Sequence, residues 1–311
     1  DINKAIHYYS LAANQNYPQA QSNLGNIYYF GEYVSRNINK AIHYYSLAAN
    51  QDFSEAQFNL GNIYYNGEYV SHDINKAIHY YSLAAKHNHS EAQLFLGTYF
   101  YFFKNIKKSI FYIELASKNG QKYANFILGF FYQEGKYIKR DINKSIMYYK
   151  EASSFNIQFA KNNLGIIFKN GVKYIEENGE ISEKFEIEPN LGLAVEYFKE
   201  SIRQKCDRIS MYNLSSIYIF NEFNMNYTNK AIELLSKSIK AGFEESYELL
   251  SIAVIKKYGH DLSNIKEGIF EKESVLLEEI KNIIYSNKLF IKSKYNDKYQ
   301  ELKETDYLYN I

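Results

Sequence analysis

The stretch DINKAIHYYSLAA at residues 1–13 returns as NINKAIHYYSLAA at residues 37–49 and as DINKAIHYYSLAA at residues 73–85. The copies are therefore spaced 36 residues apart. A unit of that length is too short to enclose a hydrophobic core of its own, so neighbouring units must stack and bury their faces against one another. The period predicts that the 311 residues form a linear array of repeats rather than one central core.

Each unit holds two helical patterns, which are clearest in the second copy. The first pattern runs from Asn39 to Asn50, with small and aromatic residues at helical spacing and Asn37 placed as its N-cap. The second pattern starts at Ser54, a residue suited to capping free N–H groups, and ends at Gly67, which supplies a left-handed C-cap. The unit is therefore predicted to be a helix-turn-helix.

A glycine preceded by leucine recurs inside the second helix of the first five units, at Gly25, Gly61, Gly97, Gly129 and Gly165. Glycine costs a helix roughly 1 kcal/mol relative to alanine, so the repeated choice needs a packing reason. We expect the two helices of one unit to approach closely there, with the glycine opposite the alanine pair of the first helix. The sixth and seventh units carry the small residues Ser215 and Ser251 at this place.

Seven units form a predicted repeat domain over residues 1–262, with boundaries near 1–36, 37–72, 73–104, 105–140, 141–189, 190–226 and 227–262. An acidic insert at about residues 172–188 is expected to be a solvated, mobile loop between stacked units. Beyond the array, residues 263–311 are predicted to hold an amphipathic helix at 274–290 that caps the stack, followed by a tail. The predicted fold class is all-α: a right-handed α-solenoid of about seven helix-turn-helix repeats with a C-terminal capping helix.

The residue pattern of the unit resembles the Sel1-like repeat, a relative of the tetratricopeptide repeat. In the second copy the matching residues are Lys40, Ala41, Tyr44, Tyr45, Ala48 and Ala49, then Ala56, Gln57, Leu60, Gly61, Tyr64, Tyr65 and Gly67. The family usually has a tryptophan where this chain has Tyr8, Tyr44 and Tyr80, a change that keeps a large aromatic ring. The resemblance implies an adaptor that scaffolds protein complexes and signalling. Its known branches include adaptors of ubiquitin ligases at the endoplasmic reticulum and activators of chitin synthase.

Composition narrows the class of partner. A formal net charge of +1, from 36 basic and 35 acidic residues, argues against a dedicated nucleic-acid binder. No run of 18 or more apolar residues is present, so no membrane insertion is expected. The single cysteine, Cys206, excludes an intramolecular disulfide framework and favours a reducing compartment such as the cytoplasm. The chain begins at Asp1 rather than at a methionine, and we interpret it as a fragment of a longer protein.

Candidate chemical sites are weak. The equivalent residues His7, His43 and His79 lie on successive first helices, in steps on the order of 10 Å. They therefore cannot converge on one zinc ion, which needs about four ligands at ~2 Å. The sequence has no phosphate loop, no nucleophile elbow and no zinc-protease motif. We predict no enzymatic activity, no cofactor and no metal. A metal site formed by His72, His87 and His89 near the loops of the third unit is considered and rejected, and Cys206 is interpreted as a spectator in an inter-helix turn.

The function predicted from the sequence is protein–protein interaction, with a protein or peptide partner on the concave face that the first helices line. The candidate residues point away from the core-forming side of these helices: His7, Ser10 and Asn14; His43, Ser46 and Asn50; and His79, Ser82 and Lys86. Two alternatives stay open. The array could be the regulatory or targeting region of a larger enzyme, such as a protein kinase, or a luminal adaptor of a ubiquitin-ligase quality-control complex.

Overall fold

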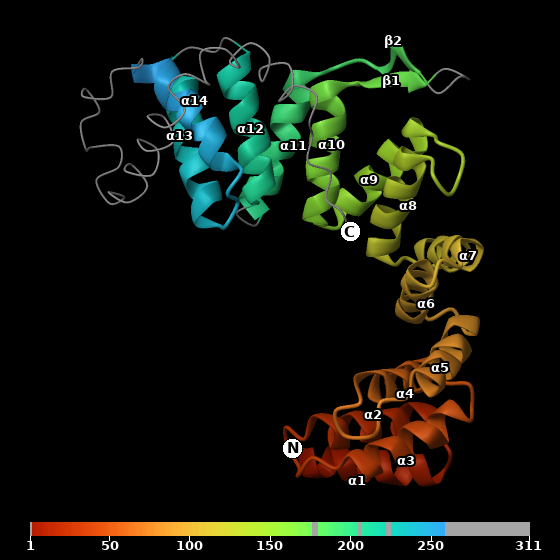
Figure 1. Ribbon diagram of the computed structural model, residues 1–311. Coiled ribbons are helices and arrows are strands. Elements are labelled where there is room, and N and C mark those ends of the chain that lie inside the picture. Colours follow the sequence, from red (N-terminus) through yellow and green to blue (C-terminus); the bar gives the residue numbers. More distant parts are fainter. Residues whose placement is uncertain (1, 176–179, 205–206, 222–224, 259–311) are drawn as a thin grey trace. The chain divides into compact units, whose positions relative to one another are not determined.

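The computed structural model describes residues 2–175, 180–204, 207–221 and 225–258. Within these ranges the chain forms fourteen helices and one two-stranded antiparallel hairpin (Figure 1). The helices divide between two compact units, residues 1–140 and residues 141–311. The predicted helix-turn-helix architecture is confirmed. The predicted capping helix at 274–290 lies outside the described residues.

The first compact unit contains eight helices of twelve or thirteen residues: α1 (Ile2–Asn14), α2 (Pro18–Phe30), α3 (Ile38–Ala49), α4 (Ser54–Asn66), α5 (Ile74–Lys86), α6 (Ser90–Phe102), α7 (Ile106–Lys118) and α8 (Lys122–Glu134). The second contains α9 (Ile142–Ser154), α10 (Gln158–Asn170), β1 (Val172–Ile175), β2 (Ile181–Ile187), α11 (Leu191–Gln204), α12 (Arg208–Phe220), α13 (Met225–Lys240) and α14 (Ser246–Tyr258). Odd-numbered helices are the first helices of the predicted repeats, and even-numbered helices are the second.

Local capping fixes where the helices begin and end. The side chain of Asn37 accepts a hydrogen bond from the Lys40 backbone N–H at 3.0 Å, as predicted for an N-cap. Gly67 ends α4 with a φ of 62°, the left-handed conformation that glycine adopts without strain. The prediction that Ser54 caps α4 is wrong. Ser54 is the first residue of that helix, and Phe53 precedes it without a side-chain cap.

The second helix of each repeat is fixed to its two neighbours by different residues. In α4, the buried Gln57 amide donates a hydrogen bond to the Ala49 carbonyl of the preceding first helix at 3.1 Å. On the other side, a Cβ added to Gly61 would lie 2.7 Å from the ring of Tyr81, which belongs to the following first helix. The Tyr81 hydroxyl donates to the Asn62 side chain at 2.7 Å.

This arrangement corrects the expected role of the repeated glycines. At Gly25, Gly61, Gly97 and Gly165 the glycine does not let the two helices of one unit approach each other, as predicted, but makes room for a ring or branched side chain of the next first helix. Gly25 faces Tyr45 and Gly165 faces Phe198 in the same manner. Consistently, α4 packs more extensively against α5 than against α3. A glycine is required because a side chain there would overlap a rigid, buried ring.

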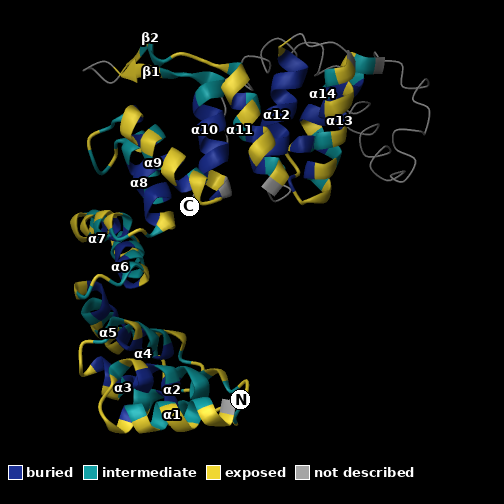
Figure 2. Ribbon diagram, turned by 180° about the vertical axis from the view of Figure 1, so that it is seen from behind, coloured by how far each residue is buried: buried dark blue, intermediate teal, exposed yellow. Residues whose placement is uncertain are grey.

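The second compact unit has a continuous core built around α12. Every residue of α12 from Ile209 to Phe220 is buried (Figure 2). This follows from the position of α12, which contacts α10 and α14 as well as its direct neighbours α11 and α13. Isoleucines, tyrosines and a phenylalanine on α12 pack against the apolar sides of α13 and α14. The helix pair formed by α13 and α14 is thereby held firmly at the end of the described chain.

The acidic insert lies between α10 and α11 as predicted, but it is not the plain loop that we expected. Strands β1 and β2 pair in antiparallel fashion, with Val172 opposite Ile187 and Lys173 opposite Phe185. Apolar residues recur along β2, and the Lys173 ammonium lies 5.6 Å from the centre of the Phe185 ring. These β-branched and aromatic residues favour paired strands, which is why the insert forms a hairpin.

Candidate protein-interaction face

The outer side of the first helices is the candidate face, and the buried side of the same helices positions it. In α3, Ala41, Tyr45 and Ala48 are buried against α2 and α4. Because a helix turns once every 3.6 residues, this leaves His43 and Asn50 on the opposite side, where both are exposed.

The structure places all nine predicted residues on the outer sides of α1, α3 and α5. Six are exposed and three are half-buried, namely the serines. The exposed residues are His7, Asn14, His43, Asn50, His79 and Lys86, and the half-buried residues are Ser10, Ser46 and Ser82. The Ser10 hydroxyl donates to the carbonyl of Ile6 in its own helix at 2.7 Å. The nine positions thus form three equivalent rows, one on each helix.

Each row also contains a leucine that the sequence analysis missed. Leu11 is 47% exposed and Leu47 is 36% exposed. Leu47 lies four residues after His43 and three before Asn50, so the three side chains share one helix face. The signal was present in the sequence, because the spacing i, i+4, i+7 marks one side of a helix. The repeated leucine was overlooked since it stands beside the core alanines.

Aromatic contacts hold the histidines of this face in place. His43 packs edge-on against Tyr44, with ring centres 5.3 Å apart, and Tyr44 stacks on Tyr28 of the preceding helix at 5.8 Å. The same edge-on contact occurs between His79 and Tyr80 at 5.4 Å. On α3 and α5 the tyrosine that supports the histidine therefore also stacks on the preceding helix, which connects the polar side chains of the face to the packed interior.

His89, weighed above as a metal ligand, has a structural role. Its Nε2 lies 3.1 Å from a Glu55 carboxylate oxygen, and its ring stacks on Phe58 with centres 4.4 Å apart. The hydrogen bond from His89 lowers the pKa of the Glu55 carboxyl below its ordinary value. Another histidine of the same region, His87, lies 3.2 Å from Asp52. Throughout the described ranges, no group of three or more His, Cys, Asp or Glu side chains is arranged to hold a metal ion.

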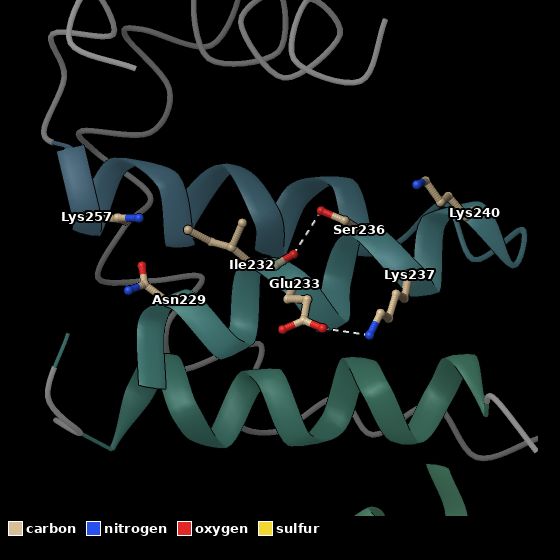
Figure 3. Close-up of a pocket in the computed structure, with 7 residues that line it drawn as sticks. All are labelled: Asn229, Ile232, Glu233, Ser236, Lys237, Lys240 and Lys257. Carbon is tan, nitrogen blue, oxygen red and sulfur yellow. Dashed lines mark hydrogen bonds and ion pairs between the residues drawn. The ribbon is translucent and has the colours of Figure 1, made fainter. Parts of the chain in front are cut away.

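A pocket with a volume of about 430 Å³ lies on the equivalent face in the second compact unit (Figure 3). Most of its lining comes from α13 and one residue comes from α14: Asn229, Ile232, Glu233, Ser236, Lys237, Lys240 and Lys257. Glu233 and Lys237 form an ion pair with an N–O distance of 2.6 Å. The Ser236 hydroxyl donates to the Ile232 carbonyl at 2.9 Å.

The residues that line this pocket can be aligned with those of the second repeat. The sequence Asn229-Lys230-Ala231-Ile232 aligns with Asn39-Lys40-Ala41-Ile42. Glu233, Ser236 and Lys240 therefore occupy the places that His43, Ser46 and Asn50 occupy in the second repeat. The sequence analysis did not name these residues, because it followed the three near-identical copies and gave less weight to the diverged ones. The pocket and the predicted rows belong to the same side of the repeat.

Comparison with known proteins agrees with this architecture. The family model described as Sel1 repeat matches residues 1–17, 18–53, 54–89, 90–121, 122–154, 159–206 and 209–243. The match at 54–89 joins α4 to α5, so the model begins each repeat at the second helix of our units. None of the described helices is long and apolar enough to span a membrane. Comparison with curated proteins gives no match.

Two solved structures are similar. A Sel1 repeat protein from Oxalobacter formigenes has 26% sequence identity and a TM-score of 0.56, over 77% of this chain and 86% of that chain. A protective antigen of uropathogenic Escherichia coli with an SLR fold has 17% identity and a TM-score of 0.54, over 98% of this chain and 83% of that chain, and shows the fold alone. The seven family matches cover more than half of the chain, and the predicted helical solenoid class is confirmed. The chain belongs to the Sel1 repeat family, whose members are typically non-catalytic scaffolds for protein–protein interaction.

Proposed function

We propose that this protein is an adaptor that binds a protein or peptide partner on the concave face lined by its first helices. The observation that carries the proposal is the repetition of one row, histidine–leucine–asparagine or lysine, on α1, α3 and α5; its polar residues are exposed on all three helices, and its leucine is exposed on α1 and α3 and half-buried on α5. An exposed leucine flanked by hydrogen-bonding side chains is typical of an interface, where apolar contact supplies affinity and a polar rim supplies specificity.

The composition of the core supports this assignment, because the residues of the candidate face do not take part in packing the repeats against one another. The residues that bury α3 are Ala41, Tyr45 and Ala48, and none of them belongs to the exposed row. Repeat arrays bind partners over extended surfaces, since each unit presents its first helix in register with the next. The protein thus has a regular surface whose side chains are available for a partner, and we propose no catalytic role for it.

The test compares the parent with a variant in which His43, Ser46 and Asn50, together with His79, Ser82 and Lys86, are changed to glutamate. Proteins captured from a lysate by each are identified by mass spectrometry. We expect the variant to lose the partners of the parent, because six carboxylates would replace neutral or basic groups on the face. Its circular dichroism should match that of the parent, since none of the six residues is in the buried core.

A deletion of residues 173–186 is the matched control. Val172 and Ile187 pair at the base of the hairpin, so the deletion joins two ends roughly 5 Å apart. We expect this deletion to keep both the fold and the captured partners. Full capture by the glutamate variant with no capture by the hairpin deletion would contradict the proposal and move the binding site to the hairpin.

A further inference from the structure

A set of asparagine side chains lies on the second helices α2 and α4. Its four members recur with the 36-residue period, three residues apart within each helix, and are half-buried: Asn23, Asn26, Asn59 and Asn62. Residues three apart lie on the same helix face. The two helices are in direct contact, and the Asn59 side-chain amide donates to the Asn26 side-chain oxygen at 3.4 Å. We call these four side chains the amide ladder.

Buried tyrosines hold the amide ladder in a fixed orientation. The Tyr45 hydroxyl donates to the Asn26 side-chain oxygen at 2.7 Å, and the Tyr81 hydroxyl donates to the Asn62 side-chain oxygen at the same distance. Both tyrosines are buried residues of the core. Because each asparagine oxygen is already bonded to a hydroxyl of the packed interior, the amide nitrogen of the same side chain is the group that remains for a ligand.

The amide ladder contains hydrogen-bonding groups that the protein leaves unused. Within the described residues, the side-chain nitrogens of Asn23, Asn26 and Asn62 donate to no protein acceptor. The Asn59 side-chain oxygen likewise accepts from no donor among them. None of these four atoms belongs to the buried, unpartnered polar atoms of the described chain, so all four are accessible to solvent. Three amide donors against one acceptor suit a ligand that offers mainly acceptors.

The spacing of the amide ladder suits a polyproline II segment. Because α2 and α4 are in contact, Asn26 and Asn62 are separated by a distance on the order of 10 Å. A polyproline II helix repeats its carbonyl direction every three residues, over roughly 9 Å. A carbonyl that accepts from Asn26 is thus followed, one turn later, by a carbonyl near Asn62. Proline has a carbonyl but no N–H group, so a proline-rich segment offers the acceptors that the ladder requires.

Aromatic side chains border the amide ladder at α4. Tyr65 lies three residues after Asn62, on the same helix face, and is 43% exposed. Phe95 of α6 contacts both Tyr65 and Tyr81, with ring centres 4.9 Å and 4.1 Å apart. Proteins that recognise polyproline II segments bind them on aromatic side chains. An exposed aromatic ring beside the free amide donors therefore supports the same ligand.

We infer that the amide ladder binds a proline-rich segment of a partner protein in the polyproline II conformation. Carbonyls of the segment accept hydrogen bonds from Asn26 and Asn62, and a proline ring packs against Tyr65. The inference goes beyond the proposed function and does not depend on it. The amide ladder lies on second helices, whereas the rows of the proposed face lie on first helices.

Two other classes of ligand fit the amide ladder less well. Each hydroxyl of a carbohydrate carries a hydrogen that needs an acceptor, and the ladder offers one free acceptor, on Asn59. A proline carbonyl has no such hydrogen. The phosphates of a nucleic acid would lie near the Glu55 carboxylate, which is exposed on α4 one turn before Asn59. An uncharged proline segment is not repelled by that carboxylate.

The experiment measures the fluorescence anisotropy of a fluorescein-labelled, C-terminally amidated decaproline peptide titrated with the full chain. A (Gly-Ser)5 peptide with the same label is the control, because it has as many carbonyls but no fixed polyproline II conformation. We expect decaproline to bind and the flexible peptide to bind about tenfold more weakly or less. Salt should have little effect on the affinity, because the ligand residues are uncharged.

The double substitution Asn26→Asp and Asn62→Asp removes the two amide donors and keeps the shape of both side chains. The Tyr45 and Tyr81 hydroxyls can still donate to the carboxylates, so circular dichroism should match that of the parent. We expect decaproline binding to weaken by about tenfold or more. The reason is that two hydrogen bonds are lost and each carboxylate repels a peptide carbonyl oxygen.

The matched control is Asn39→Asp with Asn75→Asp, which makes the same exchange at exposed positions in the first turns of α3 and α5 and should leave binding unchanged. Absence of decaproline binding by the parent, equal binding of the two peptides, or equal affinity in the two double variants would overturn the inference. Stronger competition by maltohexaose or by a single-stranded DNA decamer than by unlabelled decaproline would overturn it too. The glutamate variant of α3 and α5 should still bind decaproline, so failure of the proposed function and failure of this inference are distinguishable.

Discussion

Two junctions between successive repeats, one in each compact unit, fulfil the same packing requirement with different residues. Between the second and third repeats, Gly61 leaves space for the ring of Tyr81. Between the sixth and seventh repeats the equivalent residues are Ser215 and Leu235, and the Ser215 hydroxyl lies 3.4 Å from the Ala231 carbonyl oxygen. Where the small residue is serine instead of glycine, the large residue is leucine instead of tyrosine. The two sizes change in opposite directions, as a close-packed interior requires.

The same two junctions differ more strongly at their edges. In the first compact unit Glu55 contacts His89, and that ring stacks on Phe58. The positions equivalent to Glu55 and His89 in the second unit are Ile209 and Phe243, which are 5% and 7% exposed. A polar hydrogen-bonded contact at one junction is thus replaced by buried apolar residues of one cluster at the other. The repeat keeps the shape of its contacts, while their chemistry varies from copy to copy.

The largest effect is expected from Gly61→Leu. The added side chain would overlap the buried Tyr81 ring, so we expect a loss of about 3 kcal/mol in the free energy of unfolding. Urea unfolding followed by circular dichroism measures it. The control is Gly192→Leu in the first turn of α11, where an added Cβ would meet only the Asn190 side chain at 3.4 Å. Equal stability of the two variants would contradict the tight contact at Gly61.

A smaller effect tests whether the two junctions are interchangeable. Gly61→Ser should destabilise by overlap and Tyr81→Leu by leaving a cavity. Combined, they reproduce the Ser215–Leu235 arrangement of the second unit. We expect the double variant to lose about 1–2 kcal/mol less than the sum of the single losses. A double-mutant cycle with urea unfolding measures this coupling, and Gly61→Ser combined with Tyr149→Leu is the additive control. Additivity in both cycles would mean that the paired sizes are coincidental.

Much of the fold could be predicted from the sequence because the near-identical copies show the length and the boundaries of the repeat directly. Asn37 and Gly67 lie where their conformational preferences place them, at a helix start and a helix end. The partner of Gly61 could not be predicted in this way. Spacing within a unit identifies the buried side of a helix, but it does not say whether the preceding or the following helix covers that side. Only the three-dimensional stack assigns Tyr81 to that place.

In the candidate site, too, features that depend on one helix could be predicted, whereas features that depend on packing between helices could not. The exposed rows, such as His43 and Asn50, follow from helical periodicity and were predicted. The pocket on α13 was not, because it needs Lys257 from a second helix beside Lys240, and two residues of different helices are brought together only by packing. The hairpin after α10 was missed for a related reason. The pairing of Lys173 with Phe185 joins residues on either side of a turn, and the acidic composition of the segment obscured it.

The smallest expected effect concerns the Glu55–His89 contact and its pH dependence. The pKa of the folded-state Glu55 carboxyl is lowered from its ordinary value of 4.5 by the hydrogen bond from His89. A lowered folded-state pKa means that the ionised form is favoured by folding. The stabilisation is therefore present above pH 4.5 and is lost as the pH falls below that value through the folded-state pKa. Glu55 is 55% exposed, so the contribution is less than about 1 kcal/mol.

Replacing Glu55 by glutamine isolates this contribution. At neutral pH the variant should be less stable than the parent by a few tenths of a kcal/mol, and the difference should shrink as the pH falls below 4.5. Glu245 is the control, because it occupies in the seventh repeat the position that Glu55 occupies in the second. The described array ends with that seventh repeat. Urea unfolding across a pH series compares the two substitutions. If the pH dependence is the same in both, the His89 contact does not stabilise the first unit. If it appears only with Glu55→Gln, the hydrogen bond between Glu55 and His89 distinguishes the two junctions energetically as well as chemically.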